Sequence, residues 1–231
     1  MEFFADGLRR GVALLLGGDA EVWGTTWLSL RIALLATLFA CIFGIPLGFA
    51  VGTTRFWGRR AALTVLNTLL AFPTVVVGVV IWGLLTRRGP LGGAGLLYTS
   101  WAIVVAEIVL AIPIAAALTA AAVQGIDPRV RRTALTLGAG WWRTQWAVAR
   151  EARFALLAAV VLAFGRVLAE LGAAMIVGGN IRYHTRTLTT AVALATSQGD
   201  FALAIALGLV LLALALTVNV LLQLVQGRGD A

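Results

Sequence analysis

Two oppositely charged residues, Arg166 and Glu170, stand four positions apart inside a long apolar run. Residues at this spacing lie on one face of an α-helix, so the sequence predicts that the two side chains can meet. Charged groups are costly inside an apolar span, and they mark either a polar path or a contact that locks neighbouring helices together. The spacing alone leaves both roles open.

A second charged group follows this run in residues 178–200, which are expected to form a loop. There Arg182 and Arg186 bracket His184 among several threonines. Two guanidinium groups so placed could donate charge-assisted hydrogen bonds to a tetrahedral anion. They could equally pair with acidic residues of a partner protein, and we prefer this second interpretation. A single histidine is more often a surface residue than a metal ligand, so no metal site is expected here.

Several kinds of chemistry are excluded by residue types that the chain lacks. All 18 basic residues are arginine, so a phosphate-binding loop that ends in Gly-Lys-Ser or Gly-Lys-Thr cannot exist. Cys41 is the single cysteine, which rules out an intrachain disulfide. The apolar runs also contain no His-Glu-x-x-His and no paired carboxylates. We therefore expect no enzyme activity, no bound cofactor and no bound metal; any ATP must bind to a separate chain.

The composition of the chain indicates which kind of secondary structure must position these residues. The chain has 231 residues, of which 61% are hydrophobic and only 12% charged, with a mean hydropathy of +0.97. This predicts a single all-α integral membrane domain, and its length allows about five spans of roughly 20 residues or more. The expected spans are residues 27–51, 61–85, 100–123, 154–177 and 201–225.

Polar and helix-breaking residues within these spans need separate interpretations. Pro73 and Pro113 are taken as kinks and not as ends, because neighbouring groups in a membrane bundle can satisfy the freed carbonyls. Arg31 and Glu107 stand nearer the ends of their spans, where their side chains can snorkel to the surface, and no role is assigned to them. Residues 1–16 are expected to form a short amphipathic helix on the membrane surface.

The longest polar segment, residues 124–153, lies between the third and fourth spans. Asp127-Pro128 predicts a helix start, with aspartate as the N-cap and proline in the first turn. Gly138-Ala139-Gly140 predicts a break, after which residues 141–150 can form a second short helix. Its tryptophans recur at spacings of three or four residues. They form either a surface for a partner protein or an aromatic belt at the lipid headgroups.

The distribution of arginines predicts the orientation of the chain. Cytoplasmic loops of membrane proteins carry an excess of basic residues, so the 124–153 segment is placed in the cytoplasm. The N-terminus is then outside and the C-terminus inside. Because the arginines stand at span ends and between spans, nucleic-acid binding is not expected. The cytoplasmic side holds Arg55, Arg59, Arg60, Arg129, Arg131, Arg132, Arg143, Arg150, Arg153 and Arg228; the outer side holds Arg9, Arg10, Arg87, Arg88, Arg182 and Arg186.

The stretch 131–143 resembles the signature loop of permease subunits of ABC-type importers, especially those of the molybdate, tungstate and sulfate group. Ala134 and Gly138 match the motif Glu-Ala-Ala, three residues, Gly, whereas Arg132 and Thr133 replace its Glu-Ala pair. Further along, Val148, Arg150 and Glu151 stand where the family has Ile, Leu and Pro. The resemblance implies that this segment docks on an ATPase subunit through Arg132, Ala134, Gly138, Ala139, Gly140, Trp141, Trp142 and Arg143.

Other segments resemble the same family, so that the resemblance covers most of the chain from Trp27 onward. Residues 177–182 and 189–191 are most similar to tungstate permeases. The remaining similar segments are 72–78, 87–89, 111–113, 164–173, 179–182 and 185–187.

The resemblance implies a type I ABC importer permease fold and a multi-pass location in a prokaryotic inner membrane. It implies as partners a second copy of the chain, two ATPase subunits that bind ATP and Mg, and an extracytoplasmic oxyanion-binding protein. The cargo would be tungstate, with molybdate or sulfate as alternatives. Transport without an ATPase remains a further alternative. Within this family Arg166 and Glu170 are expected to lock the bundle, because a carboxylate beside an anion path would repel the anion.

Overall fold

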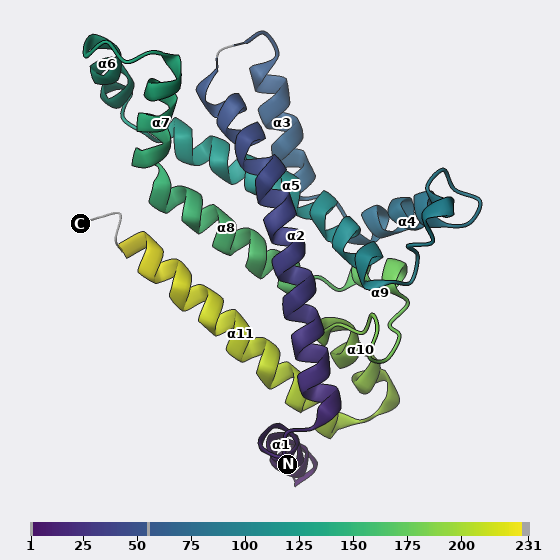
Figure 1. Ribbon diagram of the computed structural model, residues 1–231. Helices are drawn as coiled ribbons and strands as arrows, with labels where there is room; N and C mark the ends of the chain where they lie inside the picture. The colour runs from purple at the N-terminus through teal and green to yellow at the C-terminus, as the bar shows by residue number, and fades with distance from the viewer. Residues whose placement is uncertain (1, 55, 228–231) are drawn as a thin grey trace.

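The computed structural model describes the backbone of residues 2–54 and 56–227 and the side chains of residues 6–54 and 56–224 (Figure 1). Arg55 and Arg228, which contribute to the expected orientation, lie outside these ranges. Within them the chain is all helical, with no strand. The helices are α1 (Glu2–Leu16), α2 (Ala20–Thr53), α3 (Arg59–Leu70), α4 (Thr74–Leu85), the 3-10 turn η1 (Gly92–Ala94), α5 (Ser100–Gln124), α6 (Pro128–Thr136), α7 (Trp141–Glu151), α8 (Arg153–Leu168), α9 (Gly172–Gly178), α10 (Leu188–Gln198) and α11 (Phe201–Gly227).

Three helices, α2, α5 and α11, are each long and apolar enough to cross a membrane. Two further pairs are each separated by a short break and strongly bent, by 95° between α3 and α4 and by 57° between α8 and α9. Counting each pair as one span gives up to five among the described residues, which agrees with the predicted number. The second and fourth spans are therefore broken, whereas the sequence predicts continuous helices.

Pro73 lies in the break between α3 and α4 and is not a kink within one helix, so that interpretation is wrong. It is the N-cap of α4, and Phe72 before it is not helical. A residue that precedes proline is driven away from the α conformation by a clash with the proline ring. Pro113, by contrast, lies inside α5, so the prediction that it is not an end is confirmed.

The largest helix–helix interface joins α2 to α5. Gly44, Gly48 and Gly52 follow one another at four-residue intervals along α2 and face small residues of α5. A Cβ atom on Gly48 would lie 2.1 Å from the backbone oxygen of Ala116, so only glycine permits this approach. Small residues at such spacing let membrane helices pack closely. This glycine repeat was not predicted, although its spacing is visible in the sequence.

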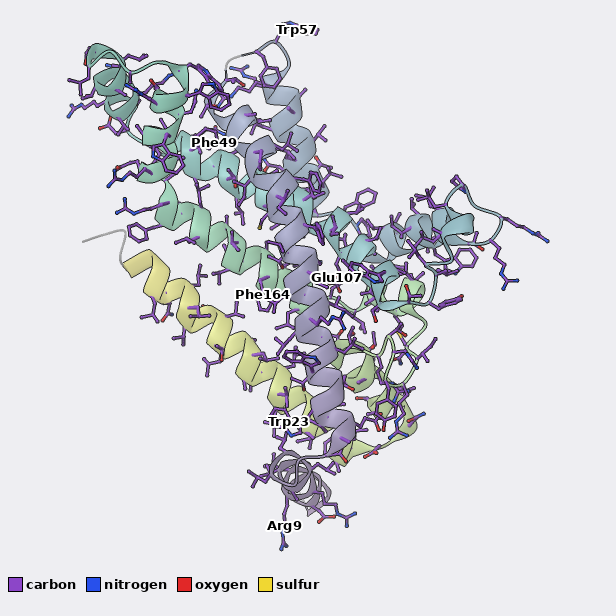
Figure 2. All side chains as sticks on the ribbon, viewed as in Figure 1. Arg9, Trp23, Phe49, Trp57, Glu107 and Phe164 are labelled. Carbon is purple, nitrogen blue, oxygen red and sulfur yellow. The ribbon has the colours of Figure 1, made fainter. Side chains whose placement is uncertain are left out.

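The two ends of the molecule carry different elements. Helices α6 and α7 and the turn between α2 and α3 lie at one end, and α1 and α10 lie at the other (Figure 1). Trp57 and Arg9 mark these two ends in Figure 2. We call them the α6 end and the α1 end.

The α1 end is more structured than the sequence predicts. Residues 2–16 form the expected helix, which packs on the start of α11 through Gly7 and Gly11. The segment 178–200, expected to be a loop, contains α10, so that expectation is wrong. Helix α10 begins with a capping box in which Thr187 and Thr190 each accept from the other's backbone N–H. Such a box usually has Glu or Gln in the place of Thr190, which hides the signal.

Candidate functional site

Helices α6 and α7 form a hairpin whose boundaries are those predicted. Asp127 caps α6 by accepting a hydrogen bond from the backbone N–H of Arg129 at 2.8 Å. Gly138 then adopts a left-handed conformation with φ of 76°, and the N–H of Ala139 donates to the oxygen of Ala134 at 2.9 Å. This is the bonding pattern of a glycine-terminated helix. Gly140 is the N-cap of α7.

Helix α6 projects from the rest of the chain. None of its side chains is buried, and its three arginines are exposed. One of them, Arg131, also donates from Nη1 to the backbone oxygen of Thr53 at the end of α2, at 3.5 Å. At the tip, the side chains of Leu135 and Leu137 are 53% and 81% exposed. Apolar side chains so exposed beside basic ones are typical of a surface that binds another protein. The exposed arginines of this helix are Arg129, Arg131 and Arg132.

The tryptophans of α7 face in a different direction. Trp141, Trp142 and Trp146 line an apolar groove of about 450 Å³ together with residues near the end of α2, among them Pro46 and Phe49. Figure 2 labels Phe49 on α2. A second apolar pocket extends from Trp146 along α8. The groove is thus continuous with the apolar flank of the spans. This arrangement favours the aromatic-belt interpretation for the tryptophans, while the tip of α6 remains the candidate docking surface.

The predicted coupling residues therefore fall into three groups. Arg132 and Ala134 lie on α6, and Gly138, Ala139 and Gly140 form the turn between the helices. The remaining three, Trp141, Trp142 and Arg143, begin α7.

Arg166 and Glu170 meet as predicted, but not on one helix. Helix α8 ends at Leu168, so the pair bridges the break between α8 and α9, and the expectation of a shared helix face is wrong. Nη1 of Arg166 lies 2.8 Å from Oε2 of Glu170. The Glu170 side chain is buried, whereas the Arg166 side chain is 46% exposed.

Glu170 joins three elements. Its Oε1 accepts a hydrogen bond from the backbone N–H of Ala173 at 3.2 Å, which caps α9. Its backbone oxygen accepts a bond from the Thr189 hydroxyl of α10 at 2.6 Å. With Arg166 on α8, these contacts support a role for Glu170 in locking the bundle.

Glu107, on α5, lies in the packed interior of the helix bundle and is only 3% exposed. The expectation that it snorkels to the surface is therefore wrong, because neighbouring helices cover the side chain. Its Oε2 atom has no hydrogen-bond partner within the described part of the chain. Arg31, for which the same was expected, is exposed.

The two arginines after α9 share an acidic partner within the chain. Arg182 Nη2 and Arg186 Nη1 lie 2.5 and 2.6 Å from the two carboxylate oxygens of Glu21, in the first turn of α2. Glu21 was not predicted as their partner, because it is more than 160 positions away from both arginines in the chain. His184 is exposed, and no group of three metal-binding side chains occurs among the described residues. Contact of Arg182 and Arg186 with an anion or a binding protein stays a prediction.

Comparison with known proteins gives three concordant results. A family model described as the inner membrane component of binding-protein-dependent transport systems matches residues 44–229. The tungstate uptake system permease protein TupB of Peptoclostridium acidaminophilum is 39% identical over 192 residues, covering 83% of this chain and 84% of the relative. The molybdenum transport system permease protein ModB of Escherichia coli K12 is 33% identical over 178 residues, covering 74% and 78%.

Among solved structures, an amino acid ABC transporter crystallised with histidines shares the fold. It superimposes with a TM-score of 0.68 at 18% identity, over 92% of this chain and 96% of that one. This fold is that of the type I importer permeases, as the resemblance implied. Identity so low supports the fold alone.

Proposed function

The chain belongs to the family of inner membrane components of binding-protein-dependent transport systems, and from that membership we propose that two copies of it form the path of a tungstate importer. The chain is a transmembrane permease subunit of an ABC importer. In the proposed complex, two ATPase subunits bind ATP and Mg, and a secreted protein delivers the oxyanion. No residue of this chain has a catalytic role in the proposal.

The projecting α6 helix is the observation that carries this proposal. A permease without a nucleotide site must receive its energy through a surface that another chain can hold. The exposed tip at Leu135 and Leu137, flanked by arginines, offers an apolar contact with a basic rim. The left-handed turn at Gly138 fixes the angle between this tip and α7. We therefore place the ATPase at α6 and the membrane interface at the tryptophans of α7.

The proposed orientation puts the α6 end in the cytoplasm and the α1 end outside. Ten of the 18 arginines then lie on the cytoplasmic side by the sequence count, in agreement with the positive-inside rule. Arg182 and Arg186 lie outside, where Arg182 keeps an exposed side chain even while it pairs with Glu21. We propose that Arg182 contacts the oxyanion-binding protein.

Tungstate is the proposed cargo because the relatives named as tungstate permeases are more similar in sequence to this chain than the relative named as a molybdenum permease. Two curated relatives named as tungstate permeases are 39% and 37% identical to this chain, against 33% for the molybdenum permease of Escherichia coli. Stimulation of ATP hydrolysis in the reconstituted complex tests this choice. Tungstate should stimulate at lower concentration than molybdate or sulfate, and a reversed order would reassign the cargo.

Docking at α6 is tested by replacing Leu137 with Asp. A carboxylate at the tip should abolish co-purification of the ATPase subunits, because it places an unpaired charge in an apolar contact. Trp57→Asp is the matched control, since Trp57 is fully exposed at the same end of the molecule but outside α6 (Figure 2). Both variants should remain monodisperse in size-exclusion chromatography. Retention of the ATPase by Leu137→Asp would show that α6 is not the docking element.

Trp142→Asp separates the two interpretations of α7. If the tryptophans form a membrane belt, this variant should keep the ATPase and lose thermal stability in bilayers more than in detergent. If α7 belongs to the docking surface, the ATPase should be lost, as in Leu137→Asp. Transport driven by an ion gradient, without any ATPase, would instead identify a secondary transporter.

A further inference from the structure

A pocket of about 380 Å³ lies at the α1 side of the bundle, between the early part of α2, the start of α5 and the loop after α9. Its deeper wall is apolar and includes Leu28, Ile32 and Val104. Its rim is polar, and there Ser100 donates a hydrogen bond from its hydroxyl to the backbone oxygen of His184 at 2.6 Å. This bond holds the loop against α5 and keeps the rim in place. The polar rim residues are Arg31, Tyr98, Thr99, Ser100 and His184.

The groups at the rim make the electrostatic potential there positive. Arg31 lines the pocket, and no hydrogen bond or ion pair joins its guanidinium to any described residue. The pocket also includes the first turn of α5, where helix N–H groups lack partners within the helix and Thr99 caps only the N–H of Ala102. A helix N-terminus of this length attracts anions. The imidazole of His184 adds a further N–H donor.

Arg31 interrupts an apolar stripe. Trp27, Leu34 and Leu38 lie on the same face of α2, and all three are more than half exposed, which in a membrane protein means contact with lipid or another chain. Trp27 lies one helical turn before Arg31, and Trp101 is half exposed at the pocket itself. Tryptophans at this position mark the level of the lipid headgroups. The pocket therefore joins an apolar wall to a cationic rim at the headgroup level.

We propose that this pocket binds a tetrahedral oxyanion group at the membrane surface, held by Arg31, His184 and the N-terminus of α5. The phosphate of a phospholipid has this chemistry, and its acyl chain would lie along the apolar wall formed by Leu28 and Ile32. A free oxyanion such as tungstate has the same chemistry without the chain. The lipid is the favoured source, because the wall is apolar and an exposed apolar stripe flanks Arg31 on α2.

The experiment measures ligand binding to the purified full-length chain by native mass spectrometry. The probes are dioleoyl phosphatidylglycerol, a glucosyl diacylglycerol with the same acyl chains but no phosphate, and sodium tungstate. Arg31→Gln should weaken phosphatidylglycerol binding roughly tenfold or more, because it removes a charge-assisted contact to phosphate. Arg31→Lys should lose less, since it keeps the charge but not the bidentate geometry.

Arg88→Gln is the matched control, because Arg88 is exposed in the loop after α4 and does not line the pocket. It should leave binding of phosphatidylglycerol unchanged. An equal thermal midpoint for wild type and Arg31→Gln without added lipid shows that the variant folds. If the chain binds tungstate, Arg31→Gln abolishes that binding, and the chain shows no preference between the two lipids, the oxyanion site is supported and its ligand is a free anion. Equal weakening by Arg31→Gln and Arg88→Gln, or no binding of any phosphate or tungstate probe, would overturn the proposal.

Discussion

Replacing the glycines of the α2–α5 interface by alanine, one at a time, should destabilise the chain in an order set by the space at each position. The new Cβ atom would lie 2.1 Å from the nearest atom at Gly48, 2.8 Å at Gly44 and 3.1 Å at Gly52. Each of these atoms belongs to α5. At Gly48 and Gly52 it is a backbone oxygen, and at Gly44 the backbone oxygen of Ile112 lies as near as the Cβ of Ala115, so none of them can rotate away. At Gly24 nothing lies within 4 Å, so this position of the same helix is the control.

Two opposing effects determine the magnitude at each position. Alanine is about 0.5 to 1 kcal/mol better than glycine in a helix interior, and Gly24→Ala should gain roughly that amount. Overpacking costs about 1 to 3 kcal/mol, or more where the backbone must move. Gly48→Ala should therefore lose about 2 kcal/mol or more, and Gly44→Ala about 1 kcal/mol. Gly52→Ala should stay near zero, because a shift of a few tenths of an ångström relieves its contact.

Unfolding of the purified variants in detergent micelles, followed by circular dichroism against temperature, gives the order directly. The expected ranking of midpoints is Gly24→Ala highest, then Gly52→Ala, Gly44→Ala and Gly48→Ala. If Gly48→Ala proved as stable as Gly24→Ala, the close approach of α2 to α5 would be refuted, and with it the interpretation of the glycine repeat.

Three further substitutions test other parts of the structure. Gly138→Ala should lower the free energy of unfolding by about 1 kcal/mol through the positive φ alone, since the added Cβ meets nothing within 4 Å. Gly138→Asn should lose less, because asparagine tolerates this conformation. Equal losses in thermal unfolding of the two variants would contradict the backbone argument. Glu170→Gln keeps an acceptor for the N–H of Ala173 but breaks the ion pair with Arg166. It should cost about 1 to 2 kcal/mol of stability by the same measurement, less than a fully buried ion pair would, because Arg166 is partly exposed. No loss of stability would exclude a locking role. Glu21→Gln should cost about 1 kcal/mol at low salt and less at high salt, since its partners are screened by ions, so a salt-independent loss would point to packing instead.

The parts of the fold that the sequence predicts well are those with local signals. Asp127-Pro128 and Gly138 begin and end α6 through contacts within a few residues, so their positions follow from residue types alone. The apolar runs predict the long helices in the same way, because length and hydropathy suffice. The hairpin at the candidate docking site was therefore predicted correctly, including its turn.

The parts that were missed depend on distant partners. Pro73 and Pro113 look alike in sequence, yet only Pro113 lies inside a helix. Helix α5 packs along α2 over its length, whereas α3 packs on α5 and α4 packs mainly on α9. Glu21 meets Arg182 only because α2 begins beside the loop after α9. Local propensity carries no information on such pairings, which tertiary packing decides.

The joint between α7 and α8 has a mechanical consequence for the whole span. Only Ala152, which is buried, separates the two helices, so α8 follows directly on the hairpin that carries the proposed docking tip. From Arg153 to Arg166 the helix is about 20 Å long, at 1.5 Å per residue. A tilt of about 10° at Ala152 moves the far end by roughly 3 Å, as much as the length of a hydrogen bond. In the proposed complex, such a tilt would carry a movement of the hairpin to the far end of α8. The separation of Arg166 and Glu170, compared between nucleotide-free and ATP-bound complexes, would measure it.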